Sequence, residues 1–337
     1  MKRSPKLRIL VVFDQGAPPP EDGNYSALMR EVAFDTERFV IKSLTGMGHE
    51  VKPFGVFNDI HDLIEELRER TPDLVFNLCE AFNNDRNQEP NLVGLFELMK
   101  VRYTGAGPAA LRLCKDKGLS KKILSYHRIP IPRFVVSRRR RPLKHLKRFT
   151  YPAFIKPLGL EGSEGIAQMS FAENERDCLD RVTFVHDSLK VDAIVEEYID
   201  GRELYVGLLG NHRLQVLPPR ELFFEQVPDG EPKFATFRAK WDEAYRKRWG
   251  IRSGPAREIP EPTRRRITEI CRKVYRLFEI KGYARIDLRL NGRGEVVFLE
   301  ANPNPSLSWW EDFAQSAKRA NLEYDELIRR IVGLAEP

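Results

Sequence analysis

The sequence lacks any uninterrupted apolar run of about 18 residues, the length that a membrane-spanning helix needs. Its opening, MKRSPKLRILVVF, passes directly into a strand-like run and carries no cleavable signal pattern. Cysteine is scarce and scattered, at Cys79, Cys114, Cys178 and Cys271, and no CxxC spacing predicts a metal or redox site. We therefore expect a cytoplasmic protein with buried or inert thiols and without a membrane partner.

Aromatic residues are absent from the most basic segment, SRRRRPLKHLKR, which runs from Ser137 to Arg148. Nucleic-acid-binding surfaces often combine basic side chains with aromatic ones that stack on bases. The segment also lies between two strand-like runs, RFVV and PAFIK. We therefore interpret it as a solvated connecting loop and helix, and we expect no nucleic-acid partner. An RNA-associated protein is the alternative, and anionic substrates would also suit a chain with a net charge of +7.

The length of 337 residues exceeds what one hydrophobic core usually supports, so two or three lobes are expected. Hydrophobic residues at 42% and charged residues at 31% are typical of a globular protein. In the first lobe, strand and helix patterns alternate, which is typical of a parallel sheet. These patterns are LRILVVF, a helical stretch near Arg30 to Met47, EVKPF, DLIEELRER and DLVFNL.

The pattern changes from KDKGLSKK onward, where short strands alternate with glycine-rich turns and favour antiparallel sheet. A long polar segment, Glu225 to Pro260, is typical of either a disordered link or a functional lid. An amphipathic helix is predicted beyond it, because apolar residues recur there at helical spacing. These residues are Ile267, Ile270, Cys271, Val274, Leu277 and Phe278.

Two predicted strands near the end of the chain, YARIDLRL and EVVFLEAN, are joined around NGRG, which favours a tight turn with an even number of residues. Side chains alternate along a strand and opposite partners share a face, so four polar residues are expected on one side. They are Arg285, Asp287, Glu300 and Asn302. Two carboxylates and an amide suit Mg²⁺, although a solvated sheet face with an exposed ion pair is the alternative.

A glycine-rich segment, FIKPLGLEGSEGI, follows a short strand that ends at Lys156. It is not a Walker A motif, but exposed backbone N–H groups in such a turn can bind phosphate while a lysine neutralises it. Lys117, in KDKGLSKK, is a second candidate cation. The segment VEEYIDGREL offers backbone groups for a base and the carboxylates of Glu196, Glu197 and Glu203.

The order of these motifs resembles the ATP-grasp superfamily, and most closely its D-alanine–D-alanine ligase branch. The resemblance covers most of the chain and lies in PDLVFNL, YTGAGPAALRLCKDKGLSKKIL, IPIPRFVV, KPLGLEGSEGI, EEYIDGRELYVGLLG, ATFRAKW, YARIDLRL and FLEANPNPSL. It implies an α/β (α+β) chain with the ATP-grasp fold, in which an N-terminal parallel α/β lobe precedes two α+β lobes that clasp ATP. The expected domains are residues 1–112, 113–195 and 196–337.

The resemblance also implies roles for individual residues, with ATP and Mg²⁺, or Mn²⁺ in its place, as cofactors. At the nucleotide it places Lys117, Lys156, Glu161, Gly162, Glu196, Glu197, Ile199 and Glu203, with the two lysines on the phosphates and Glu203 on the ribose. At the metal it places Asp287, Glu300 and Asn302. The catalytic residues would be Arg285, Ser163, Lys240 and Ser306, with Arg285 and a backbone N–H near Ser306 facing the oxyanion and Lys240 on a closing loop.

The implied activity is an ATP-dependent carboxylate–amine ligase that works through an acyl phosphate and releases ADP and phosphate. The sequence departs from the D-alanine ligases where amino acids would bind, because Glu80 and Glu311 stand at the positions of a family histidine and serine. We therefore expect small-molecule carboxylate and amine substrates other than two D-alanines, with a homodimer as an open question. The alternatives are a D-alanine–D-alanine or D-alanine–hydroxy acid ligase, and a non-catalytic nucleotide-binding regulatory protein.

Overall fold

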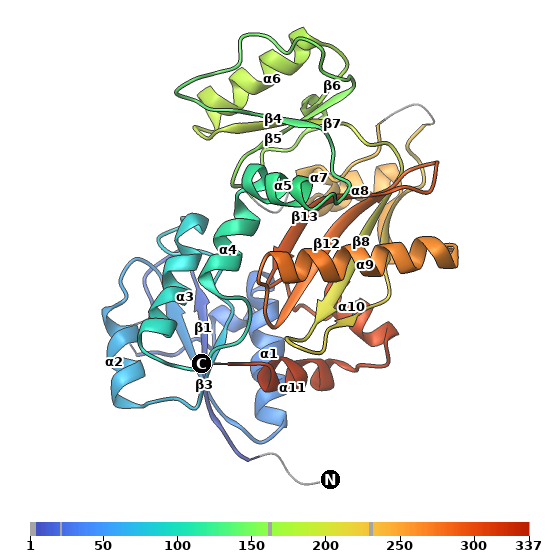
Figure 1. Cartoon of the computed structure of the whole chain (residues 1–337). Helices are drawn as coiled ribbons and strands as arrows, with labels where there is room; N and C mark the ends of the chain where they lie inside the picture. Colours follow the sequence, from blue (N-terminus) through green and yellow to red (C-terminus); the bar gives the residue numbers. More distant parts are fainter. Residues whose placement is uncertain (1–4, 21, 161–163, 229–231, 337) are drawn as a thin grey trace.

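The computed structural model describes residues 5–20, 22–160, 164–228 and 232–336 (Figure 1). Within these ranges the strands form a three-stranded, a four-stranded and a six-stranded sheet. No described helix is both long enough and apolar enough to cross a membrane. The four cysteines are buried and form no disulfide, as predicted.

The first lobe contains a parallel sheet with the strand order β2-β1-β3, as the alternating pattern predicted. Its strands are β1 (Arg8–Asp14), β2 (Glu50–Val56) and β3 (Leu74–Asn77), connected by α1 (Asp35–Gly46) and α2 (His61–Glu69). The helix expected from Arg30 begins later, at Asp35, after two short 3-10 turns. Three helices follow β3: α3 (Glu89–Leu98), α4 (Pro108–Lys115) and α5 (Lys117–Tyr126).

The central sheet is antiparallel, with the order β4-β7-β5-β6, as expected for this part of the chain. Its strands are β4 (Phe134–Ser137), β5 (Ala153–Pro157), β6 (Phe171–Ala172) and β7 (Ala193–Glu197). Helix α6 (Glu175–Ser188), which the sequence reading missed, packs on this sheet through Cys178, Val182 and Val185. The missed helix is short of apolar residues, and its signal is easily lost among the neighbouring strands.

The basic segment from Ser137 to Arg148 contains no helix, so that part of the prediction is wrong. Arg138 to Arg141 instead form a tight turn directly after β4, closed by the N–H of Arg141 donating to the Arg138 carbonyl at 2.9 Å. Pro142 follows at once, and the residue before a proline is disfavoured in helical conformation. Consecutive arginines would also repel one another on a helix.

The largest sheet is antiparallel, with the order β11-β10-β8-β12-β13 and β9 paired to β8. Its strands are β8 (Arg202–Leu209), β9 (Gln215–Val216), β10 (Arg220–Phe224), β11 (Ile251–Pro255), β12 (Tyr283–Leu290) and β13 (Val296–Pro303). The predicted amphipathic helix is α9 (Glu261–Leu277), and its apolar side shares a core with one face of β8 and β12. Alternation along these strands turns Tyr205, Arg285 and Asp287 to the opposite face.

The polar segment from Glu225 to Pro260 has regular structure in its described part. It contains α7 (Phe237–Trp241), α8 (Glu243–Trp249) and strand β11. This part of the segment is therefore not a disordered link, and its role as a lid stays a prediction.

The hydrophobic cores connect the first and last parts of the chain. One core joins β1 and β3 to the C-terminal helices α10 (Asp312–Arg319) and α11 (Tyr324–Gly333). The central sheet and α6 have a smaller core of their own. In Figure 1 the central sheet with α6 correspondingly stands apart from the rest, which lies below it. The domain boundaries at 112/113 and 195/196 stay predictions, and they fall inside α4 and β7.

Candidate active site

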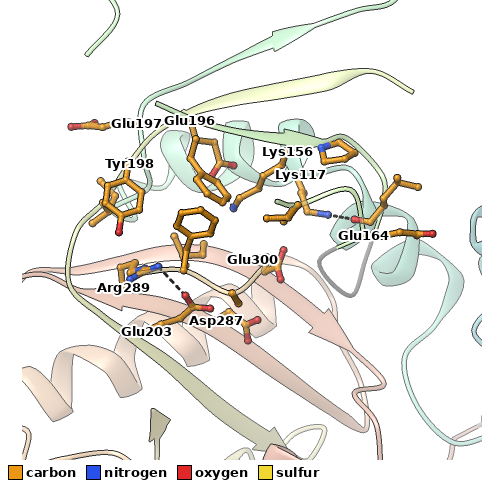
Figure 2. A pocket seen from close by; sticks show the side chains of 18 residues that line it. Lys117, Lys156, Glu164, Glu196, Glu197, Tyr198, Glu203, Asp287, Arg289 and Glu300 are labelled. Carbon is orange, nitrogen blue, oxygen red and sulfur yellow. Dashed lines mark hydrogen bonds and ion pairs between the residues drawn. The ribbon is translucent and has the colours of Figure 1, made fainter. Parts of the chain in front are cut away.

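A cavity lies between the central sheet and the largest sheet (Figure 2). It encloses about 750 Å³, part of which is open to solvent. The structure brings eight of the predicted site residues to its wall: Lys117, Lys156, Glu196, Glu197, Ile199, Glu203, Asp287 and Glu300. Six of the candidate nucleotide residues and two of the candidate metal ligands therefore line one cavity.

Lys156 and Glu196 form a buried ion pair on the central-sheet wall, with Nζ 3.0 Å from Oε2. Glu196 is also 3.2 Å from the ammonium of Lys121, so one carboxylate is held between two lysines. Burial raises the pKa of Glu196, but the two ammonium groups outweigh it and the pKa lies below its ordinary value. Burial also opposes the charge of Lys156, yet Glu196 and Glu300 hold its pKa above the ordinary value.

Lys121 is a site residue that the sequence reading missed. It is fully buried, and burial lowers its pKa to about 8 against the opposing attraction of Glu196. Its ammonium donates to the carbonyl of Leu299 at 2.5 Å. Lys121 thus links the central sheet to β13, next to Glu300. The signal that could have found it is its position four residues after Lys117 on the same helix.

Lys117 lies at the first position of α5 and is almost fully buried. Its ammonium donates to the carbonyl of Leu160 at 2.6 Å, at the start of the glycine-rich segment. Asp116 caps the helix by accepting from the N–H groups of Gly118 and Leu119 at 3.0 and 2.9 Å. Glu161, Gly162 and Ser163 lie outside the described residues.

Aromatic side chains form the apolar part of the cavity, and the sequence reading did not identify them. The rings of Phe154 and Phe234 meet edge to face at 4.6 Å, and Tyr198 lies beside them. Their faces suit a planar base. Ile199 joins this wall, whereas Figure 2 shows the Glu197 side chain pointing away from the centre of the cavity.

Glu203, predicted at the ribose, already has two hydrogen-bond partners in the structure. Tyr205 donates its hydroxyl to Oε1 at 2.8 Å. Arg289 donates to Oε2 at 2.9 Å (Figure 2). Arg289 also binds the carbonyls of Gly201 and Lys233. Each carboxylate oxygen can accept a second hydrogen bond, so these contacts orient Glu203 without preventing it from binding a hydroxyl.

The four polar residues of the hairpin share one face, but by a different route from the one predicted. Strand pairing ends at Leu290 and Val296, so the turn has an odd number of residues, 291–295, and the even-numbered turn is wrong. An odd turn alone would pair Asp287 with Leu299. A bulge at Leu299 instead places Glu300 opposite Asp287, and Asn302 opposite Arg285. Because of the bulge, the Leu299 carbonyl is free of strand pairing and accepts a hydrogen bond from Lys121.

The candidate metal ligands on this face are held by close contacts. Arg285 donates two hydrogen bonds to Asp287, at 2.8 and 2.9 Å, and Asn302 donates its amide to the same carboxylate at 3.1 Å. Burial opposes the charge of Arg285, but Asp287 outweighs it and holds the pKa of the guanidinium well above the ordinary value. Among the described residues, no three His, Cys, Asp or Glu side chains gather as a metal-binding group.

A second pair of an arginine and an aspartate lies close to Arg285, and the sequence did not predict it. Arg220 donates to Asp312 at 2.6 Å, and both side chains are mostly buried. Asp312 and Asp287 both contribute to the raised pKa of Arg285. The ring of Tyr205 lies 4.8 Å below the Arg285 guanidinium. The face that carries the candidate oxyanion residue is therefore rigidly paired.

The NPNPS turn after β13 connects this face to the first lobe. Asn304 accepts from the N–H of Ala106 at 2.8 Å, and the hydroxyl of Ser308 lies 2.7 Å from that of Thr36 in α1. Ser306 is exposed, with its hydroxyl 3.4 Å from Thr36. The structure therefore places Ser306 at the contact with α1, whereas Lys240 lies in α7 with a side chain outside the description.

The two candidate substrate residues lie outside the wall of the cavity. Glu80 is exposed and pairs with Arg86 at 2.9 Å, and its backbone N–H donates to Asp14 at 2.6 Å. Glu311 precedes α10 and is partly buried. Whether either one meets a substrate stays a prediction.

Comparisons with known proteins agree with this geometry. The family model described as "D-ala D-ala ligase C-terminus" matches residues 114–333, more than half of the chain. An "Uncharacterized protein y4sG" of Sinorhizobium fredii is 30% identical over 79% of this chain and 75% of its own length. A D-alanine--D-alanine ligase of Desulforudis audaxviator is 28% identical over 91% of this chain and 94% of its own.

Solved structures show the same fold. The D-alanine--D-alanine ligase from Bacillus anthracis complexed with ATP has a TM-score of 0.74 at 20% identity, with 97% of each chain covered. The VanG D-Ala:D-Ser ligase from Enterococcus faecalis has a TM-score of 0.71 at 20% identity, with 98% of this chain and 99% of that chain covered. The chain therefore has the ATP-grasp fold and belongs to the D-alanine–D-alanine ligase family of ATP-grasp ligases.

Proposed function

We propose that the protein joins a carboxylate to an amine with ATP, through an acyl phosphate, and releases ADP and phosphate. One observation carries this proposal: two lysines and two carboxylates line one cavity. Lys117 comes from the start of α5 and Lys156 from the central sheet, whereas Asp287 and Glu300 come from the largest sheet. Cations suit the phosphates of ATP. The two carboxylates would repel those phosphates, although Arg285 already neutralises part of the charge of Asp287. Asp287 and Glu300 would hold a divalent metal ion, which would supply positive charge against the phosphates.

The donor set fits Mg²⁺, with Mn²⁺ as an alternative. Asp287 and Glu300 are directly opposite on neighbouring strands, and Asn302 turns its N–H to Asp287, which leaves its carbonyl oxygen as an acceptor. Oxygen ligands of this kind, together with phosphates and water, are what Mg²⁺ prefers. When bound, the ion would neutralise charge on the transferred phosphate.

The chain's own residues then have distinct tasks. Lys117 and Lys156 bind the phosphates, the residues of the aromatic wall hold the adenine, and Glu203 accepts from the ribose. A substrate carboxylate oxygen attacks the γ-phosphorus while the bond to ADP breaks, which gives an acyl phosphate. The amine nitrogen then attacks the acyl carbon, loses a proton, and expels phosphate. Arg285 faces the oxyanion of this second step, together with a backbone N–H near Ser306.

The reactive acyl phosphate must be kept from water. Segment 225–260 carries Lys240 and lies beside the aromatic wall through Phe234. We assign it to closure over ATP, with Lys240 and Ser163 at the transferred phosphate.

The substrates are proposed to include an amine or guanidinium beyond the reacting groups. Glu80 lies next to two further carboxylates, Asp14 and Glu37, at the ends of β1 and α1. Burial, with added repulsion from Asp14 and Glu80, raises the pKa of Glu37 to about 7. Arg86 already pairs with Glu80, so the remaining acidity comes from Asp14 and, above about pH 7, from Glu37. Such a region favours a cation and repels a second free carboxylate. The alternative, a D-alanine ligase, is what most of the named relatives are called.

The test is a screen for ADP release over amino acids and short peptides, with mass measurement of the product. We expect turnover that depends on Mg²⁺ and that Glu300→Gln and Asp287→Asn abolish while the protein stays folded. Glu295→Gln, on the turn of the same hairpin, is the matched control and should retain activity. Full turnover in Glu300→Gln would reject the metal assignment. ATP binding without turnover on any substrate would favour the regulatory alternative.

The preferred substrates form a separate test. We expect D-alanine alone to give little product and a basic substrate to give more. Glu311→Ser should reduce the difference in product yield between D-alanine and the basic substrate. Efficient D-alanyl-D-alanine synthesis without a gain from basic substrates would restore the alternative. We place this chemistry in the cytoplasm, where ATP and reduced thiols occur together; light scattering would settle whether the protein is a homodimer.

A further inference from the structure

A second cavity lies between the first lobe and the central sheet. It is separate from the cavity between the central sheet and the largest sheet, which we call the nucleotide cavity. The walls of the second cavity come from α3, α4, the turn after β4, the end of β5 and the residues before β7. It encloses about 1950 Å³ and is wide open to solvent. We call it the basic groove, because its cationic side chains are Arg112, Lys115, Arg138, Arg139, Arg140, Arg141 and Lys190.

The carboxylates in contact with the basic groove neutralise only part of this positive charge. Lys115 is buried and paired with Glu89, with Nζ 2.8 Å from Oε2. Asp192 accepts from the Arg138 guanidinium and from the backbone N–H of Arg139, both at 2.8 Å. Asp116 caps α5 through its Oδ1. Across the described part of the chain, the Arg140 and Arg141 guanidinium groups have no hydrogen bond or ion pair. The groove therefore keeps an excess of positive charge after its internal contacts are made.

The basic groove has the chemistry of a phosphate site rather than of a nucleobase site. Arginine binds phosphate through paired N–H groups, and four arginines follow one another in the tight turn. Among the described residues no aromatic side chain lines the groove, so these residues offer bases no stacking surface. The groove is too wide for a single phosphate, and its cations are spread over three segments of the chain.

The basic groove and the nucleotide cavity are lined by the same segment, residues 156–160. Lys156, Pro157 and Leu160 line the nucleotide cavity, whereas Leu158 and Gly159 line the groove. The N–H of Leu158 donates to the Asp192 carbonyl at 2.7 Å, which ties this segment to the groove wall. A ligand in the groove would therefore contact the glycine-rich segment from the side away from ATP.

We infer that the basic groove is a second anion site, and that it binds a small ligand with two or more phosphate groups. The inference goes beyond the proposed function and does not rest on catalysis. The ligand could be a free oligophosphate or the diphosphate of a larger metabolite, and both share the chemistry that the arginines recognise. Because the groove lies against Leu158 and Gly159, its ligand should also change the apparent affinity for ATP.

Calorimetry with inorganic tripolyphosphate at low salt tests the site without a base or a metal. The variant Arg140→Glu/Arg141→Glu reverses two exposed charges in the turn and should weaken binding about tenfold or more. Arg265→Glu/Arg266→Glu, on the exposed side of α9, changes the net charge equally and should alter binding less than about twofold. Lys190→Gln, in a different wall, should weaken binding in the same direction as the first variant.

Lys156→Ala separates the two sites, because it removes a nucleotide cation and leaves the basic groove intact. Tripolyphosphate binding that survives Lys156→Ala and fails in Arg140→Glu/Arg141→Glu supports the groove. Loss in Lys156→Ala with retention in the groove variant would assign the ligand to the nucleotide cavity and overturn the inference. Absence of binding by the wild type, or equal loss in the α9 variant, would also overturn it.

Two further arms identify the ligand class. A nucleoside diphosphate linked to a sugar, compared with tripolyphosphate, distinguishes a diphosphate metabolite from free oligophosphate, and tighter binding of either supports the site. Duplex RNA binds through many phosphates, so its affinity falls steeply with salt. If RNA binds more tightly than either small ligand and loses affinity steeply with salt, the small-ligand inference is wrong.

Discussion

Glu196 is a carboxylate with only 2% of its surface exposed, and it remains charged because two lysines share it. Removing one partner of a buried ion pair is costly, since the other charge is left without compensation. Here the second lysine limits that cost. In the proposed function, Lys156 would turn to a phosphate while Lys121 continues to hold Glu196 and the Leu299 carbonyl.

Lys121→Met should therefore weaken ATP binding by about tenfold, because Glu196 loses a cation and the Leu299 carbonyl loses its donor. The protein should remain folded, since methionine fills a similar volume. Lys122→Met, at an exposed neighbouring position, is the control and should bind ATP normally. Calorimetry with ATP measures both. Equal affinity in the two variants would show that Lys121 has no part in positioning the site.

Glu37 provides a prediction about stability and pH. Its pKa is raised from 4.5 to about 7 by burial and by repulsion from Asp14 and Glu80, and its Oε2 has no hydrogen-bond partner among the described residues. Tyr324 also lies close enough to be affected by its charge. Because the folded state holds the proton more tightly, this group's contribution is complete below pH 4.5. It is lost as the pH rises through 7.

Glu37→Gln should thus remove a fall in the free energy of unfolding on the order of 3 kcal/mol between pH 4.5 and 8. The variant should be more stable than the wild type at pH 8 and about equal at pH 5. Urea unfolding at a series of pH values measures the difference. A wild type and variant with parallel pH profiles would contradict the buried-carboxyl argument.

Helix α5 shows how one cap positions a functional side chain. Asp116 ends α4 and accepts from two N–H groups at the start of α5, where Lys117 is the first residue. Asp116→Ala should lower the free energy of unfolding by about 1 kcal/mol. It should also weaken ATP binding, because the start of α5 that positions Lys117 loses its cap. Asp116→Asn keeps an accepting oxygen and should do little. Urea unfolding and calorimetry test both variants. An Asn variant as defective as the Ala variant would indicate that the charge, not the cap, matters.

The β12–β13 hairpin shows how much of an element's geometry the sequence predicts. Alternation correctly predicted that Arg285, Asp287, Glu300 and Asn302 share a face, because the side-chain period is fixed by the strand. The turn length was wrong, and the bulge at Leu299 compensated for it. A bulge is set by long-range contacts, here with Lys121, which a local pattern does not contain.

Some other residues of the site could have been predicted from local spacing, and others could not. Arg289 could have been found from its spacing of two from Asp287, and Lys121 from its spacing of four from Lys117. The pair of Arg220 and Asp312 joins positions 92 residues apart, so no local spacing predicts it. The turn of arginines was misread as leading to a helix because charge pattern alone does not specify a backbone.

At the scale of the whole molecule, the first lobe and the largest sheet are packed together through shared cores, while the central sheet has its own. ATP would bind across the junction with the central sheet. The amine and carboxylate would meet nearer to the other junction, where the NPNPS turn contacts the first lobe. Changes at these two junctions should therefore affect different substrates.

Asn304 tests this separation. Its Oδ1 accepts from the N–H of the fully buried Ala106, and its φ of 50° suits glycine or an Asn-like residue. Asn304→Gly removes the acceptor without backbone strain and should cost about 1–3 kcal/mol of stability, because a buried N–H is left unpaired. It should also raise the KM for the amine substrate several-fold while the Kd for ATP stays within about twofold of the wild type.

Asn304→Asp keeps an oxygen at the same position and should retain both stability and the KM for the amine. Urea unfolding, ATP calorimetry and steady-state kinetics on the two variants give the three numbers needed. If Asn304→Gly weakened ATP binding as much as it raised the amine KM, the two junctions would act as one unit, and the first lobe would have to be counted among the parts that hold the nucleotide. If the Gly and Asp variants were equally defective, the amide N–H groups of Asn304 would matter more than its contact with Ala106. The geometry of the turn predicts that Asn304→Gly, and not Asn304→Asp, loses stability and has a higher KM for the amine. It predicts that the affinity for ATP is unchanged in both variants.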